Sequence, residues 1–380
     1  MSLKVDHLNA DTTFLLTFSP DVNSTQGPAS EKFTVLVDPW LAGSSEIWTP
    51  KFSISHHTSA SVVSSLADMP LPDLIIISQD KSDHCHEATL KTLPSDSQVH
   101  ILAMPSAAKK IKSWRYFTHA NIESFPTYNP KNQDSVVRIP LMPTKALSGR
   151  LGEMTISFIP QKLDMTNLHN VIGFTYQPPY IFDSRPQQNP TFELPLSPPM
   201  TPTASQSPSS QTPSQDLTAL SAQAFPIPPR PRMDSPDSDA HKRPLSVLYA
   251  PHGIGIPCIT PFMKNHLAPM NALPLTLLFH CINVEQNPWW LGGMVAPGLP
   301  GGTALVKTFG AKTWLSAHDE AKDNSGWATA LIKSRQYTMD EAQVLLDHDL
   351  EKAAEESGNS SATSTQLVNL GVGERLTVTV

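Results

Sequence analysis

The segment LIIISQDKSDHCHEATL, Leu74–Leu90, leads from a continuous apolar run into a polar loop and then into a helical pattern. Apolar runs of about five residues bounded by polar turns are typical of buried strands. The loop after this strand carries Asp83, His84 and His86. Side chains at a strand-to-helix junction are held by rigid elements yet stay open to solvent, which suits a metal or catalytic site. The same letters also describe a polar helix N-terminus, where Asp caps free N–H groups.

Similar apolar runs lie on both sides of this segment. We expect strands at residues 13–18, 33–38, 74–78, 99–104, 154–159, 245–250, 275–281, 312–318 and 375–380. Helical patterns lie between them at residues 83–93, 106–114 and 302–309. A late helix begins at Thr338, where Thr338 and Glu341 form a capping box. The sequence therefore predicts an α/β (α+β) fold in which two β-sheets pack face to face with helices outside.

Proline divides the chain into blocks. The chain has 380 residues and 37 prolines, and 14 of the prolines lie in residues 185–244 among many Ser, Thr and Gln. Such a stretch buries too little apolar surface to offset the entropy of ordering it. We therefore expect residues 1–184 to form the first half of one domain and residues 245–380 its second half. Residues 185–244 are expected to be a disordered Pro/Ser-rich insertion.

Two kinds of partner would suit the insertion. The segment PIPPRPR, Pro226–Arg232, has polyproline II character and would fit an SH3-type groove. Five residues precede proline, as a proline-directed kinase requires: Ser197, Thr201, Ser207, Thr212 and Ser235. The alternative is that any Ser/Pro-rich linker contains such pairs by chance.

Charge and composition narrow the class of protein. With 27 Lys and Arg against 34 Asp and Glu, the net charge is −7, and the absence of a basic run disfavours nucleic acid as a partner. No apolar stretch reaches the length of about 18 residues that a membrane span needs. Three cysteines without CxxC spacing exclude a disulfide framework and fit a reducing compartment. A cytoplasmic protein with a small-molecule substrate is expected.

Together with LVDPWLAGS, Leu36–Ser44, the Asp83–His84 pair gives the chain a family resemblance. It resembles the metallo-β-lactamase superfamily, and the run SQxxxDHCH is similar to a branch of metallo-hydrolase-like proteins from plants and cyanobacteria. The resemblance implies a four-layer αββα sandwich and the loop motif HxHxDH. The six motif positions fall on Gln79–His84, so Asp83 and His84 match while the first two histidines are absent.

The resemblance also implies where the remaining ligands would fall. A third family histidine follows a strand at the place where this chain has Gln161 and Lys162. His252 stands where the family has an Asp that bridges two ions, and His318 matches the final histidine. The ligands are thus lost unevenly between the two ion sites of the family.

Sorted by ion, the resemblance favours one site. The first ion's positions are held by Gln79, Lys81 and Gln161 or Lys162. The second ion's positions are held by Asp83, His84 and His318, with His252 as a further ligand. If the loop is shifted, His86 replaces His84. We therefore expect one divalent ion, zinc, at the second site and no good ligand at the first.

The resemblance implies a metal-dependent hydrolase that uses a metal-bound water on an ester, lactone or phosphodiester bond. Asp83, Lys81 and His252 are its expected catalytic residues. His252 would bind the ion or transfer a proton, and Lys81 or Lys162 would stabilise a developing oxyanion. Alternatively, Lys81 pairs with Asp80 or Asp83 on a solvated loop. For the whole chain, the alternative is a catalytically inactive scaffold or binding protein of the same fold, which the missing histidines favour.

Some other residues invite a functional interpretation. His56 and His57 could contact substrate, but a solvated loop is the preferred interpretation. His280 lies in an apolar run and is expected to be a core histidine with satisfied hydrogen bonds. Cys85 would need a paired base and a lowered pKa to act as a nucleophile, and we expect no such role. The pair Trp289–Trp290 would either wall the pocket or pack under a loop.

Overall fold

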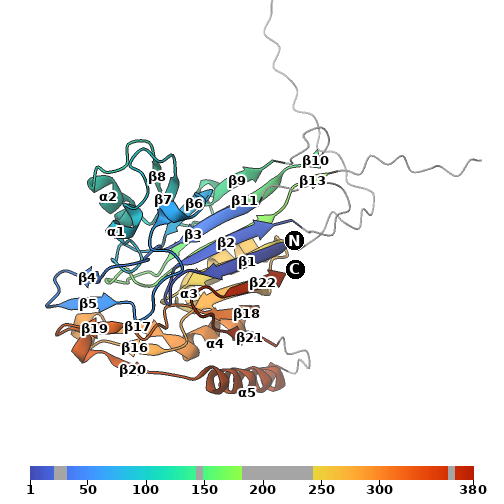
Figure 1. The fold of residues 1–380 in the computed structure, drawn as a ribbon. Helices are drawn as coiled ribbons and strands as arrows, with labels where there is room; N and C mark the ends of the chain where they lie inside the picture. Colours follow the sequence, from blue (N-terminus) through green and yellow to red (C-terminus); the bar gives the residue numbers. More distant parts are fainter. Residues whose placement is uncertain (21–31, 143–148, 182–242, 358–363) are drawn as a thin grey trace, which may run out of the picture. The chain divides into compact units, whose positions relative to one another are not determined.

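The computed structural model describes residues 1–20, 32–142, 149–181, 243–357 and 364–380. The described residues on both sides of the predicted insertion belong to one compact unit, which is built around two large sheets (Figure 1). Most of the predicted insertion, residues 185–242, lies outside the described residues, and so do its kinase and SH3-type segments.

The first sheet has seven strands in the order β22-β1-β2-β3-β6-β7-β8. They are β1 (Ser2–His7), β2 (Phe14–Ser19), β3 (Phe33–Val37), β6 (Leu74–Ile77), β7 (His100–Ala103), β8 (Asn121–Ser124) and β22 (Arg375–Thr379). From β22 through β1 and β2 to β3, neighbouring strands pair antiparallel. From β3 through β6 and β7 to β8, they pair parallel.

The second sheet also has seven strands, in the order β21-β18-β15-β14-β12-β11-β9. They are β9 (Val137–Leu141), β11 (Gly152–Pro160), β12 (Asn170–Gln177), β14 (Leu245–Ala250), β15 (Leu275–His280), β18 (Ala311–Ser316) and β21 (Gln366–Val368). Strands β14, β15, β18 and β21 are parallel. Every residue of β14 and β15 is buried, as expected for central strands covered on both faces.

Smaller sheets and the helices complete the fold. One small sheet pairs β10 (Gly149–Arg150) with β13 (Tyr180–Ile181). In a second, β5 (Ser53–His56) lies between β4 (Ser45–Ile47) and β19 (Asp323–Ser325). In a third, β16 (Val284–Gln286) lies between β17 (Met294–Pro297) and β20 (Lys333–Arg335). The α-helices are α1 (Glu87–Leu90), α2 (Pro105–Ser113), α3 (Ile256–Phe262), α4 (Gly298–Phe309) and α5 (Met339–Ser357). No described helix is both long and apolar enough to cross a bilayer.

The two large sheets pack face to face through apolar side chains. Phe14 of β2 meets Phe279 of β15 with ring centroids 5.0 Å apart, and Phe18 of β2 lies 5.4 Å from Tyr176 of β12. All four side chains are fully buried. Burying a side chain of this size contributes about 1.5–3 kcal/mol, so this layer supplies much of the stability of the sandwich.

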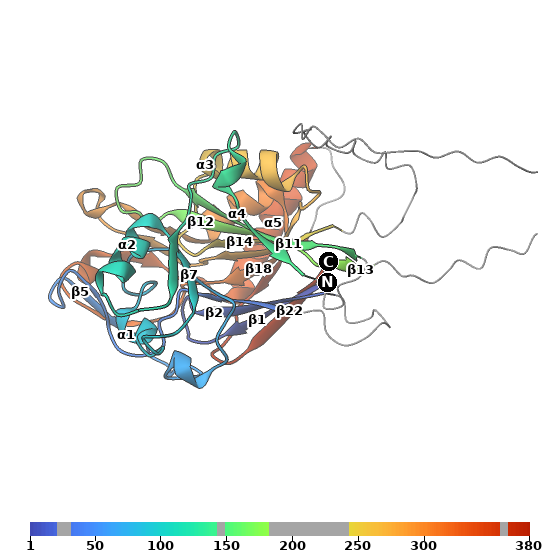
Figure 2. The same ribbon diagram turned by 90° about the horizontal axis from the view of Figure 1, so that it is seen from above.

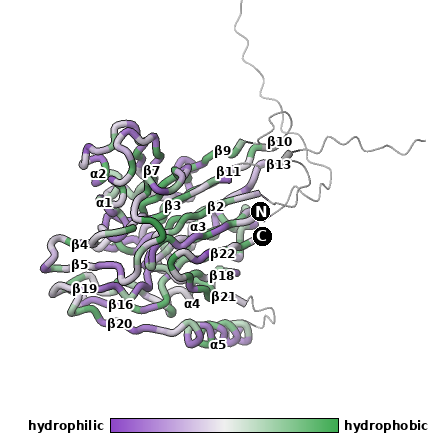
Figure 3. The backbone as a smooth tube through the Cα atoms, in the orientation of Figure 1, coloured by the Kyte–Doolittle hydropathy of each residue, from purple (hydrophilic) through white to green (hydrophobic). Residues whose placement is uncertain are grey.

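Helices cover the outer faces of the sheets. Figure 2 shows α3, α4 and α5 on one side of the sheets and α1 on the other. A second core lies between the second sheet and its helices, where Leu278 and Trp314 pack with Val306 of α4 and Leu346 of α5. Hydrophobic residues are concentrated along the strands in Figure 3, whereas β20 is mostly hydrophilic. The predicted αββα sandwich is confirmed.

The sequence prediction fails in some details. The helix expected at residues 83–93 is reduced to α1, because residues 81–86 form a tight turn and His86 caps the helix by accepting from the Thr89 N–H at 3.2 Å. Strand β1 was missed because its sequence SLKVDH alternates apolar and polar residues and contains no continuous apolar run. Gly173 interrupts the pattern of β12, which was also missed.

The carboxyl ends of β3, β6, β14 and β18 meet at one edge of the sandwich. Tyr249 of β14 donates its hydroxyl proton to Asp38, which follows β3, at 2.8 Å. His318, which follows β18, contacts Asp11 in the β1–β2 turn at 3.0 Å. These contacts join the two sheets, so the loops at this edge form a single site.

Candidate metal centre

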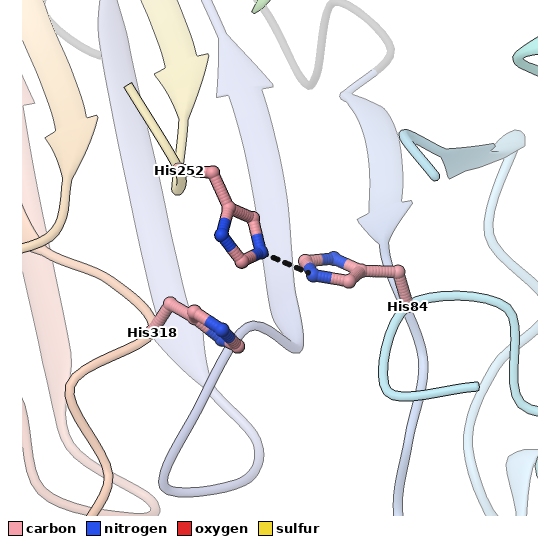
Figure 4. Close-up of side chains that lie close together, drawn as sticks. All are labelled: His84, His252 and His318. Carbon is pink, nitrogen blue, oxygen red and sulfur yellow. Dashed lines mark hydrogen bonds between the residues drawn. The ribbon is translucent and has the colours of Figure 1, made fainter. Parts of the chain in front are cut away.

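Three histidines converge at this edge. His84 follows β6, His252 follows β14 and His318 follows β18, and one ring nitrogen of each lies within 4.8 Å of the others (Figure 4). The Nε2 atoms of His84 and His252 are 3.1 Å apart. His84 and His252 are buried, and the His318 side chain is only 7% exposed. We call His84, His252 and His318 the three-histidine cluster.

The second ring nitrogen of each histidine is held by an oxygen. His84 Nδ1 lies 2.7 Å from Asp38 Oδ2, and His252 Nδ1 lies 3.1 Å from the Val295 carbonyl oxygen. His318 Nδ1 lies 3.0 Å from the Asp11 carboxylate. Carbonyl and carboxylate oxygens only accept, so each Nδ1 donates its proton, and in the neutral ring Nε2 then carries the lone pair.

This tautomer is the one that a metal ion needs. Two neutral imidazoles that face each other with Nε2 lone pairs at 3.1 Å repel unless a proton or a cation lies between them. Metal-binding histidines typically donate their other N–H to a carboxylate or carbonyl oxygen, which fixes the ring and raises its basicity. The three-histidine cluster therefore fits a divalent ion such as zinc in both its donor atoms and its supporting contacts.

Asp38 is the main support of His84. It is fully buried, and besides His84 and Tyr249 it accepts from the Ser78 N–H at 2.7 Å and the Ser78 hydroxyl at 2.6 Å. Its φ of 44° lies in the left-handed region, where non-glycine residues are uncommon and often mark functional sites. Burial, together with the adjacent Asp38 carboxylate, raises the pKa of Tyr249 well above its ordinary value, so the tyrosine stays a donor.

Asp11 supports His318 in a similar way. It is buried in the β1–β2 turn, where Asn9 Oδ1 accepts from the backbone N–H groups of Asp11 and Thr13. Its carboxylate contacts both His318 and Lys322, whose Nζ lies 2.8 Å away. Burial opposes ionisation, but the contacts with His318 and Lys322 hold the pKa of Asp11 well below its usual range. The φ of His318 is 69°, so this ligand position also has an unusual backbone.

Asp83 lies close to the same histidine. Asp11, Asp83 and His318 form a second group whose ligand atoms lie within 4.8 Å of one another. Among the described residues, Asp83 Oδ1 is buried and has no hydrogen-bond partner. Burial opposes ionisation, yet the nearby His84 and Lys322 side chains hold the pKa of Asp83 below its ordinary value. A buried charged oxygen without a donor is costly, which favours a cation near it.

The positions expected for a first ion are engaged elsewhere. Gln79 donates Nε2–H to the Leu168 carbonyl oxygen at 2.9 Å, and Gln161 Oε1 accepts from the Gly255 N–H at 2.8 Å. Gln79 Oε1 is buried without a partner among the described residues. Lys81 Nζ lies 3.0 Å from Asp80 Oδ1, as in the solvated-loop alternative, and Lys162 is exposed.

The structure groups the expected ligands differently from the sequence. The sequence assigns Asp83, His84 and His318 to one ion with His252 as a further ligand, whereas the structure brings His84, His252 and His318 together and places Asp83 in a second group that shares His318. His86 is not part of either group, since its ring nitrogens contact Thr89 Oγ1 at 2.9 Å and the Ser44 carbonyl oxygen at 3.2 Å.

Three supporting residues were missed by sequence reasoning: Asp38, Asp11 and Lys322. Asp38 lies within the quoted LVDPWLAGS segment, so the motif pointed to it without revealing its contact with His84. Asp11 and Lys322 sit in polar loops without any distinctive pattern. Their role depends on a turn between strands that meets a loop about 300 residues later, and local spacing does not predict such a contact.

Other residues singled out from the sequence have structural contacts. The preference for a solvated loop is wrong for His57, whose ring stacks on Trp40 at 3.7 Å and whose Nδ1 lies 2.6 Å from Glu320. His280 is buried as expected, but only Nδ1 is paired, with the Cys281 carbonyl oxygen, and Nε2 has no partner among the described residues. Burial raises the pKa of Cys85 to about 12, which suits an unreactive thiol.

A comparison with known protein families finds a match to a segment that includes residues of the candidate centre. Residues 28–139 match the family described as the beta-lactamase superfamily domain. The matched segment contains both Asp38 and the Asp83–His84 pair. This segment is similar to that superfamily domain, and the similarity covers less than a third of the chain. A search of curated protein sequences gives no match.

Solved structures similar to this chain share little sequence with it. An isothiocyanate hydrolase from Delia radicum gut bacteria is 12% identical, with 98% of each chain covered and a TM-score of 0.45. A metallo hydrolase from Ignicoccus hospitalis is 10% identical over 99% of this chain and 98% of that chain, with a TM-score of 0.45. A possible metal-dependent hydrolase from Veillonella parvula is 10% identical over 99% of each chain, with a TM-score of 0.47.

Proposed function

We propose that this chain is a metal-dependent hydrolase that holds one divalent ion, zinc, and cleaves an ester, lactone or phosphodiester bond of a small molecule. The observation that carries the proposal is the three-histidine cluster, in which every Nδ1 is tied to an oxygen and the Nε2 atoms of His84 and His252 face each other. Three protein ligands with one open position are the arrangement of a catalytic zinc site.

The residues around the cluster would prepare it for the ion. Asp38 and Asp11 fix the ring orientation of His84 and His318 through charge-assisted hydrogen bonds, so little order has to be gained on binding. The Val295 carbonyl oxygen does the same for His252. When bound, a divalent ion lowers the pKa of a coordinated water and polarises the substrate oxygen.

Asp83 is the proposed proton acceptor. Its Oδ1 is buried, has no hydrogen-bond partner among the described residues and belongs to the group that shares His318 with the cluster. Its lowered pKa keeps the carboxylate ionised near neutral pH, so it can accept a hydrogen bond from the nucleophile. Lys81 is proposed to stabilise negative charge on the substrate after leaving its surface contact with Asp80.

The test is hydrolysis of a panel of chromogenic esters, lactones and phosphodiesters by zinc-loaded protein. Turnover of one class is expected, with loss on chelation and recovery on adding zinc. Asp83→Asn should lower kcat by about 10²–10⁴-fold while the zinc content stays unchanged, because it removes a proton acceptor. A protein that binds zinc but cleaves none of the three bond classes would instead support the alternative of an inactive scaffold.

A further inference from the structure

The ammonium group of Lys322 lies inside the candidate centre. Its Nζ is 2.8 Å from Asp11 Oδ2 and 3.3 Å from His318 Nδ1. The side chain is only 10% exposed, although lysines are almost never fully buried unless they are paired. Its position four residues after His318 places it in the loop that follows β18.

The surroundings of Lys322 are those of a cation site. Asp11 and Asp83 bring two carboxylates within 4.8 Å of each other beside His318, and carboxylate oxygens are ligands that divalent ions accept. The Trp40 ring lies 5.7 Å from Nζ, and its face also favours a positive charge.

We propose that Lys322 is a built-in cation that fills the second cation position, formed by the carboxylates of Asp11 and Asp83 beside His318, so that the centre accepts one divalent ion only. The ammonium contributes one positive charge against the two carboxylates, and a divalent ion in the same place would lie directly against it. The identity of the ion at the three-histidine cluster rests on the proposed function, whereas the occupancy of the second position does not.

A purely local role for Lys322 leads to a different expectation. If the lysine only neutralised Asp11, its removal would weaken the support of His318 and lower the affinity of the first ion. If it fills a cation position, its removal leaves Asp11 and Asp83 without a counter-charge, and a second ion enters. The number of bound ions therefore separates the two roles.

The experiment measures zinc bound per chain at equilibrium, by elemental analysis and native mass spectrometry, in wild type and in Lys322→Met. We expect one equivalent in wild type at excess zinc and two in Lys322→Met. The double variant Asp11→Asn/Lys322→Met, which removes a carboxylate together with the ammonium, should return to one equivalent. The matched control is Lys110→Met, since Lys110 is part-buried nearby but donates to the Asp80 carbonyl oxygen outside the cluster; it should bind one equivalent.

Several outcomes overturn the assignment. Wild type that takes up two equivalents overturns it whether or not any variant folds, and so does a folded Lys322→Met protein that binds no more zinc than wild type. Lys322→Arg keeps the charge and should bind one equivalent, which provides a second variant if Lys322→Met does not fold. If wild type binds no zinc while Lys322→Met binds one equivalent, the proposed function fails but the assignment of Lys322 stands.

Discussion

The two halves of the candidate centre use their polar side chains in opposite ways. In the three-histidine cluster, hydrogen bonds are made by Nδ1, so the Nε2 atoms are left for a ligand. At the positions of the first ion, Gln79 and Gln161 instead direct their amide groups to the backbone of neighbouring loops. Hydrogen bonds thus orient the imidazole rings in the three-histidine cluster, whereas at the first-ion positions they connect neighbouring loops. The difference supports the proposal of a single divalent ion at the three-histidine cluster.

Removing two ligands from the cluster should have the largest effect. In His84→Ala/His252→Ala the ion loses two of its three imidazoles, and we expect no zinc to copurify with the variant. The measurement is zinc content by elemental analysis after exhaustive dialysis, with circular dichroism to show that the variant is folded. Zinc sites in proteins use three or four protein ligands, so a site reduced to one imidazole should lose its ion completely.

The matched control replaces two side chains by alanine at the first-ion positions. Gln79→Ala/Gln161→Ala removes two side chains at the first-ion positions and should keep the wild-type zinc content. If this control loses its zinc while the histidine variant keeps it, the contrast between the two halves is reversed.

A substitution of Asp38 tests how much the orientation of the His84 ring contributes to metal affinity. Asp38→Asn keeps the size of the side chain but removes the charge that His84, Tyr249 and Ser78 share. Loss of such a supporting contact typically costs about 10–100-fold in metal affinity, and we expect a fall of that order in a competition titration with a zinc chelator. Asp73→Asn is the control, because Asp73 accepts from Thr34 at the exposed end of the same strands. Equal affinities for the two variants would contradict the role of Asp38.

His266 lies away from the candidate centre, and its pKa is shifted mainly by burial. His266 packs on Phe262 with ring centroids 5.2 Å apart, and its Nε2 lies 3.1 Å from Thr155 Oγ1. Burial lowers its pKa from 6.5 to about 4. The unfolded chain therefore binds a proton below pH 6.5 that the folded chain does not, and stability is lost as the pH falls towards 4.

From these two pKa values, acidification from pH 7 to pH 5 should lower the free energy of unfolding by about 2 kcal/mol through His266 alone. Urea unfolding of His266→Gln should show a smaller loss between the two pH values than wild type does. The exposed His119 provides the control, and His119→Gln should follow wild type. A His266→Gln protein with the full wild-type loss would show that the imidazole titrates normally in the fold.

Much of the fold could be predicted from local patterns. Strands such as β6, β14 and β15 are continuous apolar runs because both of their faces are covered, and this burial is visible in the sequence. Strand β1 was missed because it lies near the edge of its sheet and alternates apolar and polar residues. An alternating pattern thus indicates a strand that is buried on one face, whereas a continuous apolar run indicates a strand that is buried on both faces.

The candidate centre was less predictable than the fold. His84, His252 and His318 were named because each follows a predicted strand, and the carboxyl ends of these strands meet at one edge. The sequence assigns all four ligands to one ion, and their division into two groups that share His318 depends on how the two sheets pack. The contacts of Asp11 and Lys322 require that packing as well as a turn and a loop with no sequence signature.

The smallest effect is expected from Lys81, which lies on the same loop as His84 but outside the cluster. Its Nζ contacts Asp80 at 3.0 Å, and the two side chains are 29% and 24% exposed. Surface pairs of this kind contribute about 0–1 kcal/mol, so Lys81→Met should change neither the unfolding free energy nor the zinc content by a measurable amount. Turnover on the substrate class found active is the deciding measurement. A fall in kcat of more than tenfold with zinc retained would mean that Lys81 leaves Asp80 to stabilise the substrate, whereas full turnover would remove it from the catalytic residues and leave the positive charge beside the cluster to Lys322.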